Sequence, residues 1–267
     1  MSNATRCAIA VALVGIIASS STSFARTSED GAAWIAKAEA HLYRWQRPGS
    51  FVRFELKTDA LEAPIAAMER ELATKPDREA SLVVDALKHV VVHGVVDTGS
   101  GGVQTEIVID CDTKDPSARA CIEKMKNAVD GLVRGAFEGL PLRDPSLVAK
   151  GASVLAAEIQ GDAVLVTLGG RNAGDETTTL HIDRRSELPS LMEMPAARLA
   201  YEYSEVAPGH FAPTRLEIQA KNAPARAAEY TWQKLGNLVF PESIRLSQGP
   251  HSTRFTFESV QIEARPR

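Results

Sequence analysis

A cluster of reactive side chains lies between Thr179 and Pro189, where the sequence reads TLHIDRRSELP. His181, Asp183 and Glu187 stand within seven residues, so the stretch has the residue types of a general acid and base. A catalytic His–Asp pair also needs a nucleophile and a pocket, and the chain has no Gly-x-Ser-x-Gly motif. We therefore interpret the stretch as a solvated turn between two strands, with a binding rim and a catalytic site as the alternatives.

Two histidines, His89 and His93, stand four residues apart, which on a helix is a spacing for metal ligands. The valines between them predict a strand instead, and no His-Glu-x-x-His pattern is present. The glycine-rich stretch at 98–102 lacks the Lys and Ser/Thr of a phosphate-binding loop, which favours a hairpin loop. We expect no metal, no cofactor and no catalytic residue.

The first 25 residues are typical of a secretory signal peptide. Arg6 precedes an apolar run from Ala8 to Ile17, and small residues follow up to Ala25. A membrane anchor is the alternative, but the run is about half of the ~20 apolar residues that span a bilayer. Cleavage leaves 267 − 25 = 242 residues with a net charge of 29 − 34 = −5, which argues against binding to nucleic acid. We expect a single domain over 26–267, with no transmembrane segment.

Export changes the interpretation of Cys111 and Cys121, the two cysteines that remain after cleavage. An oxidising compartment favours a disulfide between them, which would join a strand end to the start of a helix. A redox or metal pair is the alternative, but neither a Cys-x-x-Cys spacing nor a nearby histidine accompanies them.

The predicted secondary structure changes along the chain, from a mixture of helices and strands to strands alone after Lys150. Apolar residues at helical spacing predict helices at 29–42, 60–73, 78–88 and 116–140. Alternating or β-branched runs predict strands at 51–57, 89–97 and 103–112, and roughly eight further strands follow Lys150. Because short connections join the later strands, we expect an antiparallel meander. The apolar stripe of the last helix is either core packing or a lid over an apolar cavity.

The meander has one apolar face that needs a cover. The helices are the obvious cover, which gives an α+β fold: a strongly curved antiparallel β-sheet, an unclosed barrel, with helices across its concave face. Side chains expected on that face are candidates for lining an apolar cavity, and a sealed core is the alternative. They are Trp34, Phe54, Val164, Val166, Leu180, Ile182, Leu216, Ile218, Tyr230, Trp232, Phe255 and Phe257.

Several motifs resemble a known family. They are the strand pair around Gly161-Asp162, the stretch from Thr177 to Met194, the sequence Gly236-Asn237-Leu238-Val239-Phe240-Pro241, and Arg47-Pro48-Gly49-Ser50-Phe51-Val52-Arg53. Together they are similar to the periplasmic lipoprotein-carrier superfamily, the LolA/LolB-like proteins. The resemblance implies a periplasmic protein whose unclosed barrel binds acyl chains under helices, with Arg47 in contact with the lid. The helices predicted at 60–88 depart from it, because the family has strands there.

We therefore expect a non-catalytic carrier or binding protein for a lipid or lipoprotein acyl chain. Such a ligand needs an apolar lining, since each buried methylene contributes about 0.8 kcal/mol without directional chemistry. The first alternative is an envelope module that uses the same scaffold for protein–protein interaction or sensing. The second is a metal-assisted hydrolase built on His89, His93, His181 or scattered carboxylates, although no ligand motif is visible.

Overall fold

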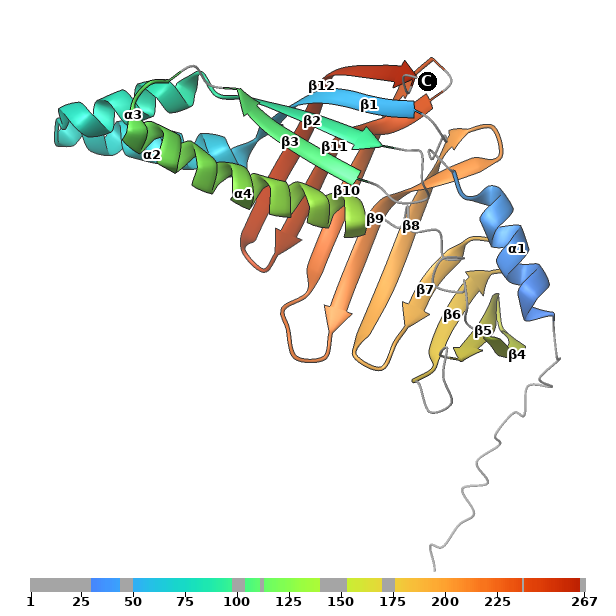
Figure 1. Cartoon of the computed structure of the whole chain (residues 1–267). Helices are drawn as coiled ribbons and strands as arrows, with labels where there is room; N and C mark the ends of the chain where they lie inside the picture. The colour runs from blue at the N-terminus through green and yellow to red at the C-terminus, as the bar shows by residue number, and fades with distance from the viewer. Residues whose placement is uncertain are drawn as a thin grey trace, which may run out of the picture.

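One antiparallel sheet runs through the whole computed structural model, which describes residues 30–43, 50–97, 104–110, 113–139, 153–169, 176–236 and 238–264 (Figure 1). Its strands are β1 (Ser50–Thr58), β2 (Val91–Asp97), β3 (Gln104–Asp110), β4 (Ser153–Gln160), β5 (Ala163–Gly169), β6 (Thr178–Asp183), β7 (Pro189–Glu193), β8 (Ala197–Ala207), β9 (His210–Ala220), β10 (Arg226–Leu235), β11 (Leu238–Gln248) and β12 (His251–Ala264). The order is β3-β2-β1-β12-β11-β10-β9-β8-β7-β6-β5-β4. Since β3 and β4 end this order without pairing to each other, the barrel is unclosed.

Four helices accompany the sheet: α1 (Gly31–His41), α2 (Asp59–Thr74), α3 (Arg78–Lys88) and α4 (Pro116–Gly139). A polar side chain accepts a backbone N–H bond at the start of each, as N-caps do. These bonds are Ala32 N to Asp30 (3.0 Å), Ala60 N to Thr58 (3.2 Å), Ala80 N to Asp77 (3.1 Å) and Ala118 N to Asp115 (2.8 Å). The sequence therefore fixes where each helix begins.

Two separate helical covers pack on one face of the sheet. At the β4 end, Ile35 and Ala38 of α1 join a core built from β4 to β7. At the other end, Val129 and Val133 of α4 join a larger core built from β1, β2 and β9 to β12. Leu199 and Tyr201 of β8 pack against both cores, which shows that the two covers share a face. Figure 1 shows α1 at one end of the sheet and α2 to α4 at the other.

The observed architecture confirms the predicted α+β fold and the unclosed, curved sheet. Among the described residues nine strands follow Lys150, close to the roughly eight predicted, and Thr178–Asp183 and Pro189–Glu193 form the two strands expected on the two sides of a turn. In the part of the chain described here, no helix is both long and apolar enough to cross a membrane. The predicted signal peptide lies outside the described residues.

The predicted disulfide is not formed in this structure. Cys121 carries a free thiol on α4, where its side chain is half-buried. Cys111 lies just outside the described residues, between the end of β3 and the cap of α4. The disulfide was predicted from the expected oxidising compartment. A disulfide also needs two Cα atoms at a suitable distance and orientation, and the compartment gives no information on either.

Candidate functional site

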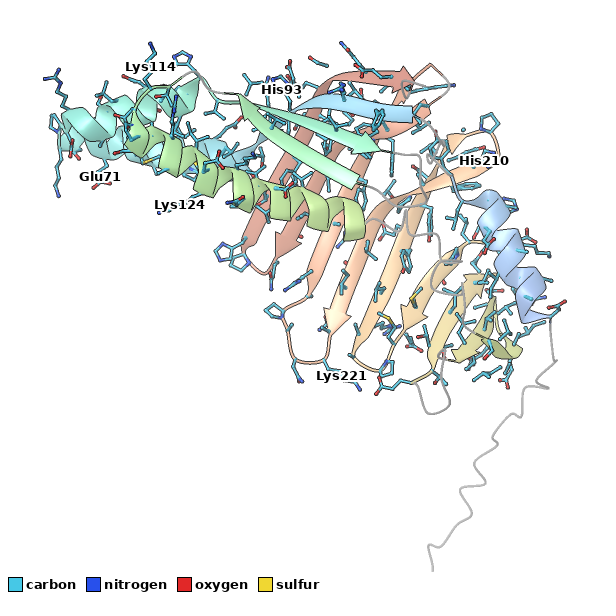
Figure 2. The ribbon with its side chains drawn as sticks, viewed as in Figure 1. Glu71, His93, Lys114, Lys124, His210 and Lys221 are labelled. Atoms are coloured by element: carbon cyan, nitrogen blue, oxygen red, sulfur yellow. The ribbon has the colours of Figure 1, made fainter. Side chains whose placement is uncertain are left out.

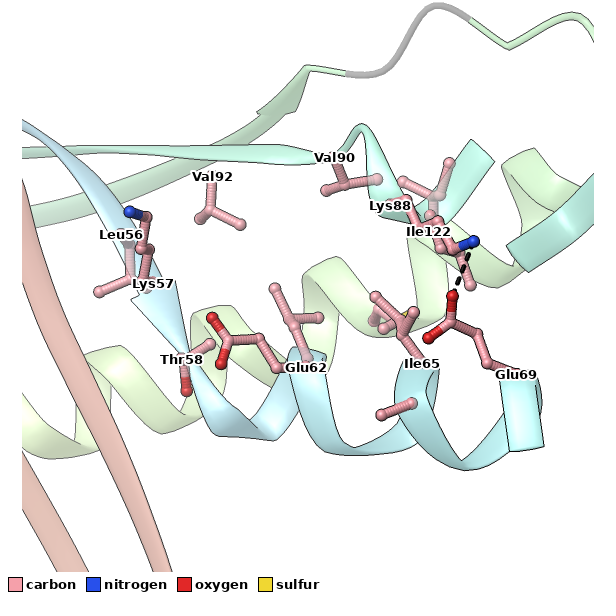
Figure 3. Close-up of a pocket in the computed structure, with 14 residues that line it drawn as sticks. Leu56, Lys57, Thr58, Glu62, Ile65, Glu69, Lys88, Val90, Val92 and Ile122 are labelled. Carbon is pink, nitrogen blue, oxygen red and sulfur yellow. Dashed lines mark ion pairs between the residues drawn. The ribbon is translucent and has the colours of Figure 1, made fainter. Parts of the chain in front are cut away.

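An apolar cavity of about 360 Å³ lies where α2, α3 and α4 meet the β1 and β2 strands (Figure 3). Its volume falls within the ~300–1,000 Å³ of small-molecule sites. The lining comes from five elements and one connection: Leu56, Lys57 and Thr58 of β1; Leu61, Glu62, Ile65, Ala66 and Glu69 of α2; Leu87 and Lys88 of α3; Val90; Val92 of β2; Ile122 and Met125 of α4. The cavity is therefore enclosed by helices on a sheet edge.

The floor and back wall of the cavity are rigid core. Leu56, Val92, Leu87 and Ile122 are each at most 7% exposed. Leu56 pairs across the sheet with Phe257, and Phe257 meets Phe54 edge-on with ring centroids 5.0 Å apart. The cavity therefore borders the aromatic centre of the larger core, which holds its floor in place.

Helix α2 forms the opposite wall, and none of its residues is buried. Beyond its first two residues, its half-buried positions are Leu61, Ile65, Met68 and Leu72, which recur every three or four residues and so form one apolar stripe. Of these, Leu61 and Ile65 line the cavity. An apolar stripe that faces unfilled space gains less from burial than one packed in a core, so α2 is the least firmly held wall of the site.

The start of α2 is nevertheless fixed to the sheet. Thr58 ends β1, is 3% exposed and caps the helix, so no loop separates strand from helix. The next residue, Asp59, accepts a backbone bond from Arg254 of β12 at 2.9 Å. These contacts make the β1–α2 junction a fixed end, from which the rest of α2 extends over the cavity.

Charged side chains surround the mouth of the cavity. Lys88 of α3 lies 2.7 Å from Glu69 of α2, and Lys57 of β1 lies 2.8 Å from Glu258 of β12 (Figure 3 draws the first pair). The hydrogen bond that each lysine donates to its glutamate raises the pKa of that lysine above its usual value, so both are charged at neutral pH. Glu62 adds a further carboxylate to the lining. The mouth thus offers both signs of charge around an apolar interior.

This arrangement of an apolar interior with charged groups at its mouth suits binding. The polar groups at the mouth are an exposed lysine–glutamate pair and its neighbours, while the interior offers only aliphatic and thioether surface. Among the described residues, no three His, Cys, Asp or Glu side chains gather as metal ligands. An aliphatic chain is the ligand type that such an interior would accept.

The structure places the predicted cavity residues in the two cores beside this site. Phe54, Leu216, Tyr230, Phe255 and Phe257 belong to the larger core, with Ile218 and Trp232 packed against it. Val164, Val166, Leu180 and Ile182 belong to the core under α1, with Trp34 packed against it. None of these side chains lines the cavity of 360 Å³. Arg47, the predicted lid contact, lies outside the described residues.

The charged turn after β6 fastens α1 to the sheet. Asp183 accepts bonds from the Ser186 amide (2.8 Å) and hydroxyl (2.9 Å), and the amide bond is the main reason why its pKa is lowered. Glu187, with φ of 58°, pairs with Lys37 at 2.9 Å and His41 at 3.1 Å, both on α1. The burial pattern confirms that Leu180 and Ile182 face inward and that His181 faces outward. The solvated turn is therefore also a helix clamp.

The α2 side of the cavity was not among the predicted site residues. A signal was available, since Leu61, Ile65, Met68 and Leu72 make a stripe on a helix with a polar opposite face. The strands of the C-terminal half have the more regular alternation, and the predicted cavity residues come mostly from them. What the stripe faces depends on the placement of α3 and α4, which is not readable from α2 itself.

Comparisons with known proteins supply no family for the chain. No protein-family model matches it, and no curated protein matches it in sequence. Solved structures similar to it include a LolA superfamily protein, NE2245 from Nitrosomonas europaea, with 10% identity, coverage of 90% of this chain and 96% of that chain, and a TM-score of 0.30. Another is MucB in complex with MucA(peri), with 13% identity, coverage of 89% of this chain and 100% of that chain, and a TM-score of 0.20. A third is the Pseudomonas aeruginosa MucA/MucB complex, with 10% identity, coverage of 90% of this chain and 100% of that chain, and a TM-score of 0.20. Values this low leave the lipoprotein-carrier resemblance a prediction.

Proposed function

We propose that this chain is a non-catalytic binding or carrier protein, exported to the periplasm, that takes the acyl chain of a lipid or lipoprotein into the cavity under α2. The observation that carries the proposal is the combination of an apolar cavity with one loosely packed wall. Leu61 and Ile65 of α2 face the cavity from a helix without a single buried residue. A ligand that fills the space would give that stripe the contacts it lacks.

The expected energetics suit an aliphatic chain. Burial of eight methylene groups would contribute about 6 kcal/mol at ~0.8 kcal/mol each. Association costs roughly 4 kcal/mol or more in lost translation and rotation, so short chains should bind weakly. Each further methylene should tighten binding about fourfold until the cavity is full. Affinity should thus depend on chain length more than on headgroup.

The mixed charges at the mouth suit the polar end of such a ligand. Lys57 and Lys88 could meet phosphate or carboxylate oxygens, and Glu62 an amine. Because each lysine already has a glutamate partner, a headgroup would exchange one ion pair for another. Such an exchange in exposed positions changes affinity little and leaves the acyl chain as the main determinant.

Isothermal titration with a series of saturated fatty acids of increasing chain length tests the proposal. Wild-type protein should bind one equivalent, with the stepwise gain in affinity described above. Ile65→Trp, which fills the cavity from a half-buried position, should weaken binding at least tenfold. Leu82→Trp is the matched control, because Leu82 lies on α3, is 53% exposed and does not line the cavity. Absence of saturable binding to the wild type, or equal binding by both variants, would contradict the proposal.

A further inference from the structure

The sheet splits between β9 and β10. These two strands pair over only four residues, from Arg226 opposite Ile218 to Glu229 opposite Arg215. Beyond that point β9 continues to pair with β8 as far as His210, while β10 continues to pair with β11 as far as Leu235. Within the described strands, therefore, the ladder between β9 and β10 stops halfway. In Figure 2, Lys221 marks the joined end of β9 and His210 marks the other end.

Local sequence explains why the strands separate. Pro213 stands in β9 just beyond the last pair, and a proline has no N–H to offer a neighbouring strand. The indole N–H of Trp232 donates to the Pro213 carbonyl at 2.8 Å, so a side chain bridges the strands where a backbone bond would otherwise form. Register shifts at Glu202/Tyr203 in the β8–β9 pair and at Thr231/Trp232 in the β10–β11 pair lie beside this point, and such shifts bend strands locally.

The split contains a cavity of about 410 Å³. Tyr230 and Trp232, whose rings stack at 6.2 Å on one face of the sheet, line it together with Thr231, which points to the other face and meets Ser243 at 2.9 Å. Thr214 lines it from β9. Ser204, Glu205 and Val206 of β8 and Val239 of β11 complete the lining, so the cavity extends from the split as far as the strands on either side of β9 and β10.

The far end of the split already holds a piece of extended backbone. Leu42 forms a parallel bridge with Phe211 of β9, and the Tyr43 amide donates to the Phe211 carbonyl at 2.8 Å. On the other side, the Val239 amide of β11 donates to the Tyr43 hydroxyl oxygen at 2.7 Å. The chain thus shows that the β9 edge of this opening accepts main-chain hydrogen bonds from an added segment.

One residue that lines the split carries a buried hydroxyl without a partner among the described residues. Tyr230 is 4% exposed, and its hydroxyl has no hydrogen-bond partner in the described part of the chain. Burial raises the pKa of Tyr230, so the hydroxyl keeps its proton and is a donor at neutral pH. Buried polar groups are nearly always satisfied, which makes an acceptor from a bound molecule the natural complement.

We propose that the split between β9 and β10 is a second binding site, which takes an extended peptide segment of a partner protein as an added strand. The peptide backbone would pair with the part of β10 that has no strand partner on the β9 side among the described residues, and it would place a carbonyl against the Tyr230 hydroxyl. Thr214, Thr231 and Gln233 in the lining favour a peptide with polar side chains. An acyl chain is the wrong occupant, because it offers no acceptor to the Tyr230 hydroxyl and no main-chain groups to the strand edges. This site is independent of the cavity under α2.

Selection of random linear ten-residue peptides on the purified full chain tests the site. Peptides enriched on the wild type should bind Tyr230→Phe about three- to tenfold more weakly, which is the loss for one neutral hydrogen bond. They should not bind Thr214→Trp, which fills the split. Tyr201→Phe is the matched control, because Tyr201 is a tyrosine of the same face outside the lining and should bind normally. Fatty-acid binding should be unchanged in all three variants.

Two readouts identify strand addition. N-methylation of successive peptide amides should abolish binding at every second residue only. Residue-resolved hydrogen exchange should show alternate amides between Tyr230 and Leu235 gaining protection when the peptide binds. The proposal is overturned if no peptide is enriched, if the enriched peptides bind Tyr230→Phe and Thr214→Trp as well as the wild type, or if the amides of 230–235 are already slow in the free protein.

Discussion

The Lys88 ammonium lies 2.7 Å from the Glu69 carboxylate, and this contact joins α3 to α2 across the mouth of the apolar cavity. This ion pair holds α2 against α3 at a position further along the helix than its fixed start at Thr58 and Asp59. Both side chains are more than 40% exposed, so the pair is accessible to solvent and to a ligand. A helix anchored at one end and latched by an exposed pair further along is suited to open and close over a ligand.

Removal of the latch should therefore change the rate of ligand uptake more than stability. In Glu69→Gln the association rate of a fluorescent fatty acid, measured by stopped flow, should rise severalfold, while the midpoint of urea unfolding should barely move. Glu71→Gln, on the exposed face of the same helix, is the control (Figure 2). Because Glu69 raises the pKa of Lys88, the pair persists at neutral pH and is lost as the pH rises through that raised pKa. An unchanged association rate would show that α2 does not move.

Gly94 should be intolerant of even one added carbon. It lies opposite Phe54 in the β1–β2 pair, and a Cβ there would stand 2.1 Å from the Phe54 ring. Gly94→Ala should therefore lower the free energy of unfolding by about 1–3 kcal/mol, as overpacking does. Gly131→Ala on α4 has nothing within 4 Å of the new Cβ and should instead stabilise the helix by about 0.5–1 kcal/mol. Urea denaturation of both variants measures the contrast, and equal effects would disprove it.

The clamp between the β6–β7 turn and α1 should weaken in acid. A hydrogen bond from Lys37 lowers the pKa of Glu187, and the Ser186 amide lowers that of Asp183. Carboxylates with lowered pKa stabilise the fold above their unfolded pKa near 4, and this stabilisation is lost as the pH falls through the lowered folded values. Asp183→Asn should reduce stability at pH 7 and flatten its decline below pH 4. Thermal melts at several pH values measure this, and parallel curves for the variant and the wild type would contradict it.

Removal of the Tyr230 hydroxyl should not destabilise the free protein. Tyr230→Phe removes only the hydroxyl oxygen of a residue that lines the split between β9 and β10, and this oxygen has no partner among the described residues. Without bound peptide, the variant should be as stable as the wild type or slightly more stable, because a buried polar group without a partner is removed. Differential scanning calorimetry measures this change. A loss of more than about 1 kcal/mol would mean that the hydroxyl is satisfied in the free protein.

Local sequence signals predicted the elements well. Helical spacing of apolar residues located α2 and α3 to within one residue, because this pattern repeats with every turn of the helix. Alternation placed Leu180 and Ile182 on the inner face, since a strand admits only two sides. Packing was harder to predict. That Ile35 and Ala38 would fill the space over one half of the sheet, while α2 would leave a cavity over the other, depends on contacts between distant segments.

The type of site could be predicted from the sequence, but the residues that line it could not. An apolar cavity between helices and sheet was expected, but its lining comes mostly from α2 to α4, where the family resemblance is weakest. The split between β9 and β10 had a local sign in Pro213, yet a proline in a strand equally suits an edge or a bulge. The disulfide between Cys111 and Cys121 was inferred from cellular compartment, and the free thiol of Cys121 shows how little such an inference says about geometry.

Photo-crosslinking locates the ligand and tests the central proposal most directly. A long-chain fatty acid with a diazirine in mid-chain would be irradiated with the full protein, and the labelled peptides would be mapped by mass spectrometry. The account predicts labelling of α2 at Leu61 or Ile65 and of α4 at Ile122 or Met125, which excess unlabelled fatty acid should suppress. Saturable labelling confined to other segments, or no saturable labelling, would show that the cavity under α2 is not an acyl-chain site.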